Sequence, residues 1–137
     1  MVSSKVTWFG GKQFVGTDSS KHSVVISSQD EDNGTGMRPL DMLLVALAGC
    51  TAMGVVHMLQ QKRQDLLDFE INISGEQEDE PPRCFNRIHI EYVAKGRGIK
   101  EKALTDAIKL SLEKYCSVSA TVKGRAEITT SYQIIEV

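Results

Sequence analysis

The chain has 137 residues, 41% of them hydrophobic, which suits one folded domain of ordinary size. Lys and Arg number 16 against 18 Asp and Glu, so the formal net charge of -2 gives no basic surface for nucleic acid. The number of cysteines is three, and an odd number argues against a disulfide framework. Their wide spacing, without a Cys-x-x-Cys pair, predicts no metal site. No apolar signal segment follows Met1, so we expect a cytoplasmic protein with reduced thiols.

The first part of the chain predicts three short strands. Residues Lys5–Gly10 alternate in polarity, and Gly10-Gly11 is typical of a hairpin turn. Residues Gln13–Thr17 would return as the second strand, and the β-branched stretch His22–Ser28 would form the third. These strands would pair in chain order as an antiparallel meander.

A long helix is predicted from about Pro39 to about Arg63. Proline is tolerated in a first helical turn, Asp41 suits the positive end of the helix dipole, and Lys62 and Arg63 suit the negative end. The uncharged stretch 42–59 is just long enough to span a bilayer. Small residues dilute this stretch and predicted strands flank it, so we expect a buried helix and no membrane contact.

The second half of the chain predicts two strands followed by a helix. Residues Phe69–Gln77 and Arg87–Ala94 alternate as half-buried strands, and we expect Gly96 and Gly98 to end the second one. Residues Lys100–Tyr115 carry an apolar stripe at helical spacing that includes Ser111.

A short helical turn and a last strand complete the prediction. The turn would cover residues 116–122 with Ser117 as its cap, and the strand would run over Arg125–Glu136 after Gly124. Because most neighbouring strands connect without a helix, the predicted fold is a single α+β domain, residues 1–137, with antiparallel sheets around the long helix.

Two cysteines are the most suggestive side chains for chemistry. Cys50 lies among small residues in the long helix, where a cavity beside the sulfur would admit a small substrate. Cys116 lies where a short helix would begin, and the helix dipole would lower its thiol pKa. In both cases the alternative is a buried thiol that only fills space. Cys84, in a loop, is interpreted as incidental.

A thiolate needs a cation or a hydrogen-bond donor close by. Arg38, directly before the long helix, and Lys12, at the tip of the first hairpin, are the candidates. The alternative for both is an ordinary solvated surface charge. We find no Ser-His-Asp order and no phosphate-binding glycine loop.

Two segments resemble those of a known family. Residues 37–53, MRPLDMLLVALAGCTAM, look like the central-helix motif of OsmC-like proteins, and residues 114–122, KYCSVSATV, look like their second cysteine motif. With both motifs in the same order of elements, the resemblance covers nearly the whole chain. It implies an intertwined homodimer with two equivalent sites at the subunit interface.

The resemblance also implies a stress-related activity. The characterised enzymes of this family are thiol peroxidases, oxidoreductases that reduce organic hydroperoxides. If these roles apply to this chain, Cys50 would attack the peroxide and become a sulfenic acid. Cys116 would then react with the sulfenic acid to form a disulfide, and an external dithiol would reduce the disulfide to two thiols. The peroxidase branch has a glutamate directly after the helix-opening proline and an arginine after the paired glycines. In this chain Leu40 follows the proline, and the acid Asp41 comes one position later. Lys12 stands in place of the arginine after the paired glycines.

The sequence therefore supports two alternative functions. One is a cysteine-based hydroperoxide reductase without a cofactor, in which Lys12, Arg38 and Asp41 stabilise the thiolate or bind substrate. The other is a non-enzymatic protein of the same fold that binds a small apolar or electrophilic ligand at the dimer interface. The substitutions at Leu40 and Lys12 keep the second function open.

Overall fold

The chain contains two small sheets, one long helix and shorter helical segments near its C-terminal end. A computed structural model describes all residues from Met1 to Val137. It contains two compact units, Met1–Leu43 and Leu44–Val137, which are described in turn. The α+β class predicted from the sequence is confirmed. The single domain remains a prediction.

The first unit is the predicted three-stranded meander. Strands β1 (Lys5–Gly10), β2 (Gln13–Thr17) and β3 (Ser23–Ser27) pair antiparallel in the order β1-β2-β3. The β1–β2 turn needs glycine, because Gly10 and Gly11 have positive φ angles of 124° and 55°. The Asn33 Oδ1 atom accepts a hydrogen bond from the backbone amide of Lys12 at 2.9 Å. This bond ties the loop after β3 to the hairpin tip.

Helix α1 runs from Pro39 to Gln61 and confirms the predicted start. It ends before Lys62, so the two basic residues predicted for its last turn lie just beyond it. Arg63 adopts a left-handed conformation with φ 55°, which terminates the helix. The helix is long and apolar enough to cross a membrane, with a mean hydropathy of 2.0. Its buried positions lie on one stripe at four-residue spacing: Leu47, Thr51, Val55 and Leu59.

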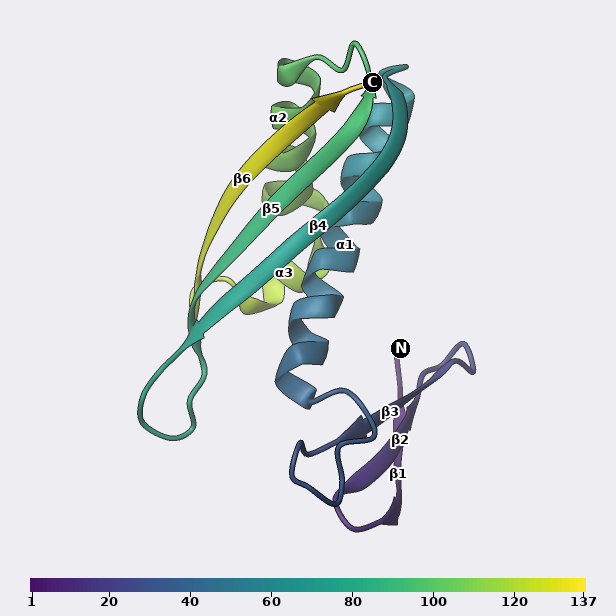
Figure 1. Cartoon of the computed structure of the whole chain (residues 1–137), viewed down its shortest axis with the longest axis vertical. Coiled ribbons are helices and arrows are strands. Elements are labelled where there is room, and N and C mark those ends of the chain that lie inside the picture. The colour runs from purple at the N-terminus through teal and green to yellow at the C-terminus, as the bar shows by residue number, and fades with distance from the viewer. The chain divides into compact units, whose positions relative to one another are not determined.

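The second sheet contains strands β4 (Asp65–Gln77), β5 (Phe85–Arg97) and β6 (Glu127–Glu136), in the order β4-β5-β6. Strands β4 and β5 are antiparallel, but β6 is parallel to β5, so the wholly antiparallel arrangement predicted is wrong. A parallel neighbour requires a long crossover connection, and the helices between β5 and β6 provide it. In Figure 1 the second unit's helices lie on one face of this sheet.

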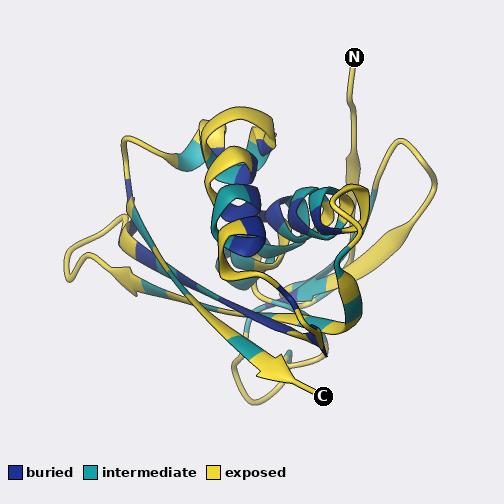
Figure 2. Cartoon of the chain, turned by 90° about the horizontal axis from the view of Figure 1, so that it is seen from above, coloured by how far each residue is buried: buried dark blue, intermediate teal, exposed yellow.

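The core of the second unit lies between that face and the helices. Along β5, Ile88, Ile90, Tyr92 and Ala94 alternate with more exposed residues and are at most 1% exposed. Figure 2 shows this central strand as the most continuously buried part of the sheet. Helix α2 (Glu101–Leu110) contributes its own buried stripe: Ala103, Leu104, Ala107 and Ile108.

Gly96 does not end β5, contrary to the prediction. It pairs with Leu66 of β4 and with Glu136 of β6, so the strand continues to Arg97. A Cβ atom at this position would collide with the backbone carbonyl of Asp65. The glycine therefore lets two strands approach closely inside the sheet.

The predicted second helix is divided in two. Helix α2 ends at Leu110, and residues Ser111–Tyr115 form a π-helical turn, η1. A short helix, α3, follows over Ser117–Val122. Widened turns of this kind are rare and are frequently found at functional sites.

Candidate active site

The structure brings Cys50 and Cys116 together. Cys50 is half-buried on α1, and Cys116 lies between η1 and α3 and is 3% exposed. The thiol of Cys116 is within hydrogen-bonding reach of the Cys50 sulfur. Both residues belong to the second unit, so residues distant in sequence form one thiol pair.

The backbone around Cys116 explains how its sulfur is held. The amide of Cys116 donates to the carbonyl of Ser111 at 2.7 Å, which closes the widened turn of η1. Cys116 is then extended, with φ -79° and ψ 104°, and acts as the N-cap of α3. Its sulfur accepts a hydrogen bond from the amide of Ser119 at 3.3 Å. Ser117, predicted as the cap, is instead the first residue of α3.

The two thiols have opposite pKa shifts. Burial raises the pKa of Cys50, but hydrogen bonds from the Cys116 thiol and from Val118 and Ser117 outweigh it, so the net pKa is lowered. Burial, and next the hydrogen bond to Cys50, raise the pKa of Cys116 above its ordinary value. Cys50 is therefore the thiol that ionises more readily.

The expectation that the helix dipole favours Cys116 is wrong for a geometric reason. The first amides of α3, those of Ser117 and Val118, act on the sulfur of Cys50. Cys116 receives one amide, from Ser119, and donates its own proton toward Cys50. The start of α3 thus stabilises a negative charge on the Cys50 sulfur.

A cluster of three buried hydroxyl groups lies next to the thiols. The Thr51 Oγ1 atom is 2.8 Å from the Tyr92 hydroxyl oxygen and 2.8 Å from the Ser111 Oγ atom. All three residues are at most 1% exposed. Sequence reasoning missed this cluster, because Ser111 was interpreted as part of an apolar stripe and Tyr92 as an ordinary strand residue. Their partnership depends on the pairing of α1, β5 and η1, which has no local signal.

Each of the three predicted charged site residues has a partner within the first unit. The Arg38 Nε atom lies 2.6 Å from the Asp41 Oδ2 atom, across the first turn of α1. The Lys12 ammonium lies 4.0 Å from Asp30 and its side chain is 74% exposed. An action of these residues on the thiols remains a prediction.

Cys84 is not an isolated loop residue. Its sulfur accepts hydrogen bonds from the Arg125 Nε atom at 3.2 Å and from the Arg125 Nη2 atom at 2.9 Å. These contacts join the β4–β5 connection to the segment before β6.

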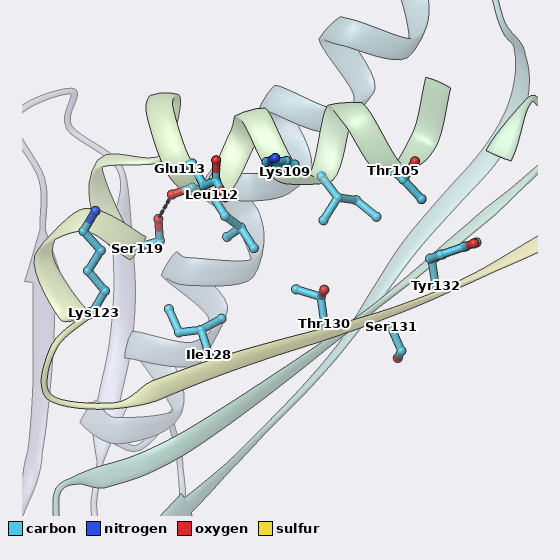
Figure 3. A pocket seen from close by; sticks show the side chains of 11 residues that line it. Thr105, Lys109, Leu112, Glu113, Ser119, Lys123, Ile128, Thr130, Ser131 and Tyr132 are labelled. Carbon is cyan, nitrogen blue, oxygen red and sulfur yellow. Dashed lines mark hydrogen bonds between the residues drawn. The ribbon is translucent and has the colours of Figure 1, made fainter. Parts of the chain in front are cut away.

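A separate cavity of about 740 Å³ lies between the crossover helices and β6. Figure 3 shows Ile128, Thr130 and Tyr132 of β6 on one side and Lys109 and Leu112 on the other. Ser119 also lines the cavity, and its amide is the one bonded to the Cys116 sulfur. Neither Cys50 nor Cys116 lines the cavity.

Comparison with known proteins decides the family. The sequence pattern described as OsmC-like protein matches residues 30–131, which include both cysteines of the pair and most of the chain. The chain belongs to the OsmC-like family. Proteins of this family are soluble and are generally homodimers.

Relatives match this OsmC-like chain over nearly its full length. Protein YhfA of Escherichia coli (strain K12) is 35% identical over 134 residues, 98% of each chain. The crystal structure of a hypothetical protein from Aquifex aeolicus VF5 is 30% identical with a TM-score of 0.88, covering 98% of this chain and 96% of that one. The organic hydroperoxide resistance protein OhrB of Bacillus subtilis shares the fold at 16% identity, with a TM-score of 0.62 over 96% of this chain and 98% of that one.

Proposed function

We propose that this protein is a cytoplasmic thiol peroxidase that reduces organic hydroperoxides, with Cys50 as the attacking thiol and Cys116 as the resolving thiol. The observation that carries the proposal is the placement of the two thiols side by side, with Cys116 as the N-cap of α3 and the first amides of that helix acting on Cys50. This arrangement lowers the pKa of Cys50 and raises that of Cys116. A peroxidatic thiol must be a thiolate, whereas a resolving thiol must keep its proton until the first step is complete. Two cysteines that only fill space would not need the amides of Ser117 and Val118 directed at one of the two sulfurs.

In the first step, the Cys50 thiolate attacks the terminal oxygen of the hydroperoxide. A sulfur–oxygen bond forms and the oxygen–oxygen bond breaks, which leaves Cys50 as a sulfenic acid and releases an alkoxide that takes up a proton as the alcohol. Sulfur is oxidised by two electrons and the peroxide is reduced by two. The amides of Ser117 and Val118 support the thiolate before attack.

In the second step, the Cys116 sulfur attacks the sulfur of the Cys50 sulfenic acid. A disulfide forms, and the hydroxide that leaves takes the proton of the Cys116 thiol as water. An external dithiol then reduces the disulfide to two thiols and is itself oxidised to a disulfide. No cofactor or metal takes part in this sequence.

Arg38, Asp41 and Lys12 are proposed to bind substrate or to stabilise the thiolate. The substitution at Leu40 displaces the acid by one position, yet Asp41 still pairs with Arg38 at 2.6 Å. An arginine held by an acid presents its remaining N–H groups in a fixed orientation. Lys12 supplies a positive charge but not a planar fork.

The active form is proposed to be a homodimer. Large apolar side chains are exposed in the single chain, including Trp8 at 64% and Met53 at 76%. Exposed apolar groups of this size are typical of an interface. Sedimentation of the full chain should give twice 15.1 kDa, and a monomer at micromolar concentration would contradict the dimer.

A peroxide-consumption assay tests the enzymatic proposal. The full chain with excess dithiothreitol should consume cumene hydroperoxide faster than hydrogen peroxide, and Cys50→Ser should abolish the catalysed rate. Cys84→Ser is the matched control, because it removes a thiol outside the pair and keeps an acceptor for Arg125. Consumption no faster than with dithiothreitol alone would overturn the proposal.

A second candidate function is the non-enzymatic binding of a small apolar or electrophilic ligand. The cavity of about 740 Å³ favours it, because that volume falls within the range typical of small-molecule sites. Its Ile108, Leu112 and Ile128 side chains would contact an apolar ligand. Saturable binding of an apolar fluorescent probe by the full chain, lost in Ile128→Arg, together with no peroxide turnover, would favour this function.

A further inference from the structure

The buried hydroxyl groups of Tyr92, Thr51 and Ser111 form a chain with one consistent direction. Ser111 Oγ donates to the carbonyl of Thr51 at 3.1 Å. The Thr51 hydroxyl must then donate to Ser111, and the Tyr92 hydroxyl must donate to Thr51. Each hydroxyl donates once, and no buried side-chain polar atom is left without a partner.

This hydroxyl chain is linked through the backbone to both thiols. Thr51 directly follows Cys50 on α1, and the carbonyl of Ser111 accepts the amide of Cys116 at 2.7 Å. Ser111 is also the first residue of the widened turn. The bonds between Thr51 and Ser111 therefore connect the backbones that carry the two sulfurs.

Close approach of η1 to α1 depends on a small residue. A Cβ atom at Gly54 would lie 3.0 Å from the Ser111 Oγ atom, tighter than an ordinary contact. Gly54 is one helical turn beyond Thr51, on the same side of α1. Glycine at this position leaves room for the serine hydroxyl to reach the helix backbone.

Packing alone does not require these hydroxyl groups. A core of apolar side chains with the same shape would be about as stable, whereas a satisfied polar network specifies a single arrangement of its elements. Here the arrangement specified is that of the turn before Cys116 against the helix turn that carries Cys50. Burial is the main cause that raises the pKa of Tyr92, and Cys116 adds a smaller electrostatic increase, so the hydroxyl cluster and the thiol pair act on one another.

We propose that Thr51, Ser111 and Tyr92 are positioning residues that hold the Cys116 thiol against the Cys50 sulfur. They do not touch the peroxide and they exchange no proton with it. Their role is to keep Cys116 in place as hydrogen-bond donor before oxidation and as attacking sulfur afterward. The inference deepens the proposed function and rests on it, but it concerns a geometry that can be measured without peroxide.

The test measures the alkylation of Cys50 by iodoacetamide as a function of pH, in the full chain with Cys84→Ser. Thr51→Val keeps the shape of the side chain and removes the hydroxyl, and Ser111→Ala removes the other hydroxyl. Both variants should lower the rate at pH 7 about threefold or more, because a displaced Cys116 no longer stabilises the Cys50 thiolate. Thr51→Ser restores a hydroxyl and should restore the rate.

Ile90→Val provides the matched control. It removes a methyl group from the same buried face of β5 and should cost about 0.5–1.5 kcal/mol of stability without changing the alkylation profile. Should Thr51→Val or Ser111→Ala fail to fold, Tyr92→Phe removes the outermost hydroxyl and tests the same chain.

A second measurement separates this inference from the proposed function. Diamide oxidises the thiol pair to a disulfide without any peroxide, and the rate of disulfide formation should fall in Thr51→Val and recover in Thr51→Ser. If wild type forms the disulfide but consumes no hydroperoxide, the proposed function fails and the inference stands. Unchanged alkylation and diamide rates in folded Thr51→Val and Ser111→Ala would overturn the inference.

Discussion

Cys116 caps helix α3 with its own sulfur, which accepts a hydrogen bond from the backbone amide of Ser119 at 3.3 Å. Serine, threonine, asparagine and aspartate usually take this position, because their oxygens are stronger acceptors. Cysteine is a weaker cap than these residues, but at this position it fixes a thiol at the start of α3. The same sulfur therefore has a structural bond on one side and Cys50 on the other.

The cap should be measurable as stability. Cys116→Ala removes the acceptor of the Ser119 amide and should lower the free energy of unfolding by about 0.5–2 kcal/mol. Cys116→Ser keeps an acceptor of the right reach and should lose less than the alanine variant. Urea unfolding under reducing conditions, at one protein concentration, measures both. Equal stability of the two variants would show that the sulfur does not act as a cap.

Cys116→Ala and Cys116→Ser should also differ in the reactivity of the Cys50 thiol. The hydrogen bond from the Cys116 thiol lowers the pKa of Cys50 more than any other hydrogen bond does, so its removal in Cys116→Ala should raise that pKa. Alkylation of Cys50 at pH 7 should then slow several-fold, while Cys116→Ser, which retains an O–H donor, should slow it less. The Cys84→Ser background leaves Cys50 as the one thiol in both variants. Faster alkylation in Cys116→Ala would contradict the hydrogen-bond assignment.

Local signals were sufficient to predict the first unit and the start of α1. The Gly10-Gly11 turn and the proline at position 39 act over a few residues, and the elements they delimit were predicted within a residue or two. The parallel pairing of β6 with β5 was not predictable in the same way. It depends on where a crossover of about thirty residues returns the chain, which no short window encodes.

The candidate site also has features that local sequence signals predict and features that depend on the packing of distant elements. Cys50 and Cys116 were identified from their motifs, but the expectation that the helix dipole lowers the pKa of Cys116 was wrong. Dipole reasoning assumed that α3 acts on its own first residue, whereas the amides of Ser117 and Val118 act on Cys50. Which sulfur an amide reaches depends on the packing of α3 against α1. The hydroxyl chain was missed for the same reason.

We expect the ionisation of Tyr92 to lower the free energy of unfolding of the chain at alkaline pH. Burial, opposed by the Thr51 hydrogen bond, raises the pKa of Tyr92 from its ordinary value of 10.0 to about 12. Because the folded pKa is above the unfolded one, the neutral form contributes stability below pH 10 that is lost as the pH rises from 10 to 12. The loss from this group is at most about 1.4 kcal/mol per pH unit.

Tyr92→Phe should be less stable than wild type at pH 8, where it lacks the bond to Thr51, and should lose less stability between pH 10 and 12. Tyr132→Phe is the control for the other tyrosine with a raised pKa, whose hydroxyl donates to Glu101 at the surface. Urea unfolding across this pH range gives both slopes. A Tyr92→Phe slope equal to that of wild type would mean that Tyr92 ionises as readily as in the unfolded chain.

The assignment of roles to the two thiols can be tested by trapping the first oxidation product. A brief exposure to less than one equivalent of cumene hydroperoxide, followed by dimedone and mass spectrometry, locates the sulfenic acid. In Cys116→Ser the adduct should accumulate on Cys50, because the first step needs only the attacking thiolate and no thiol remains to displace the hydroxide. Wild type should show little adduct and a Cys50–Cys116 disulfide, and Cys50→Ser should show neither. Dimedone adduct mainly on Cys116 would reverse the two roles, and its absence from both sites with accessible thiols would instead favour the binding protein.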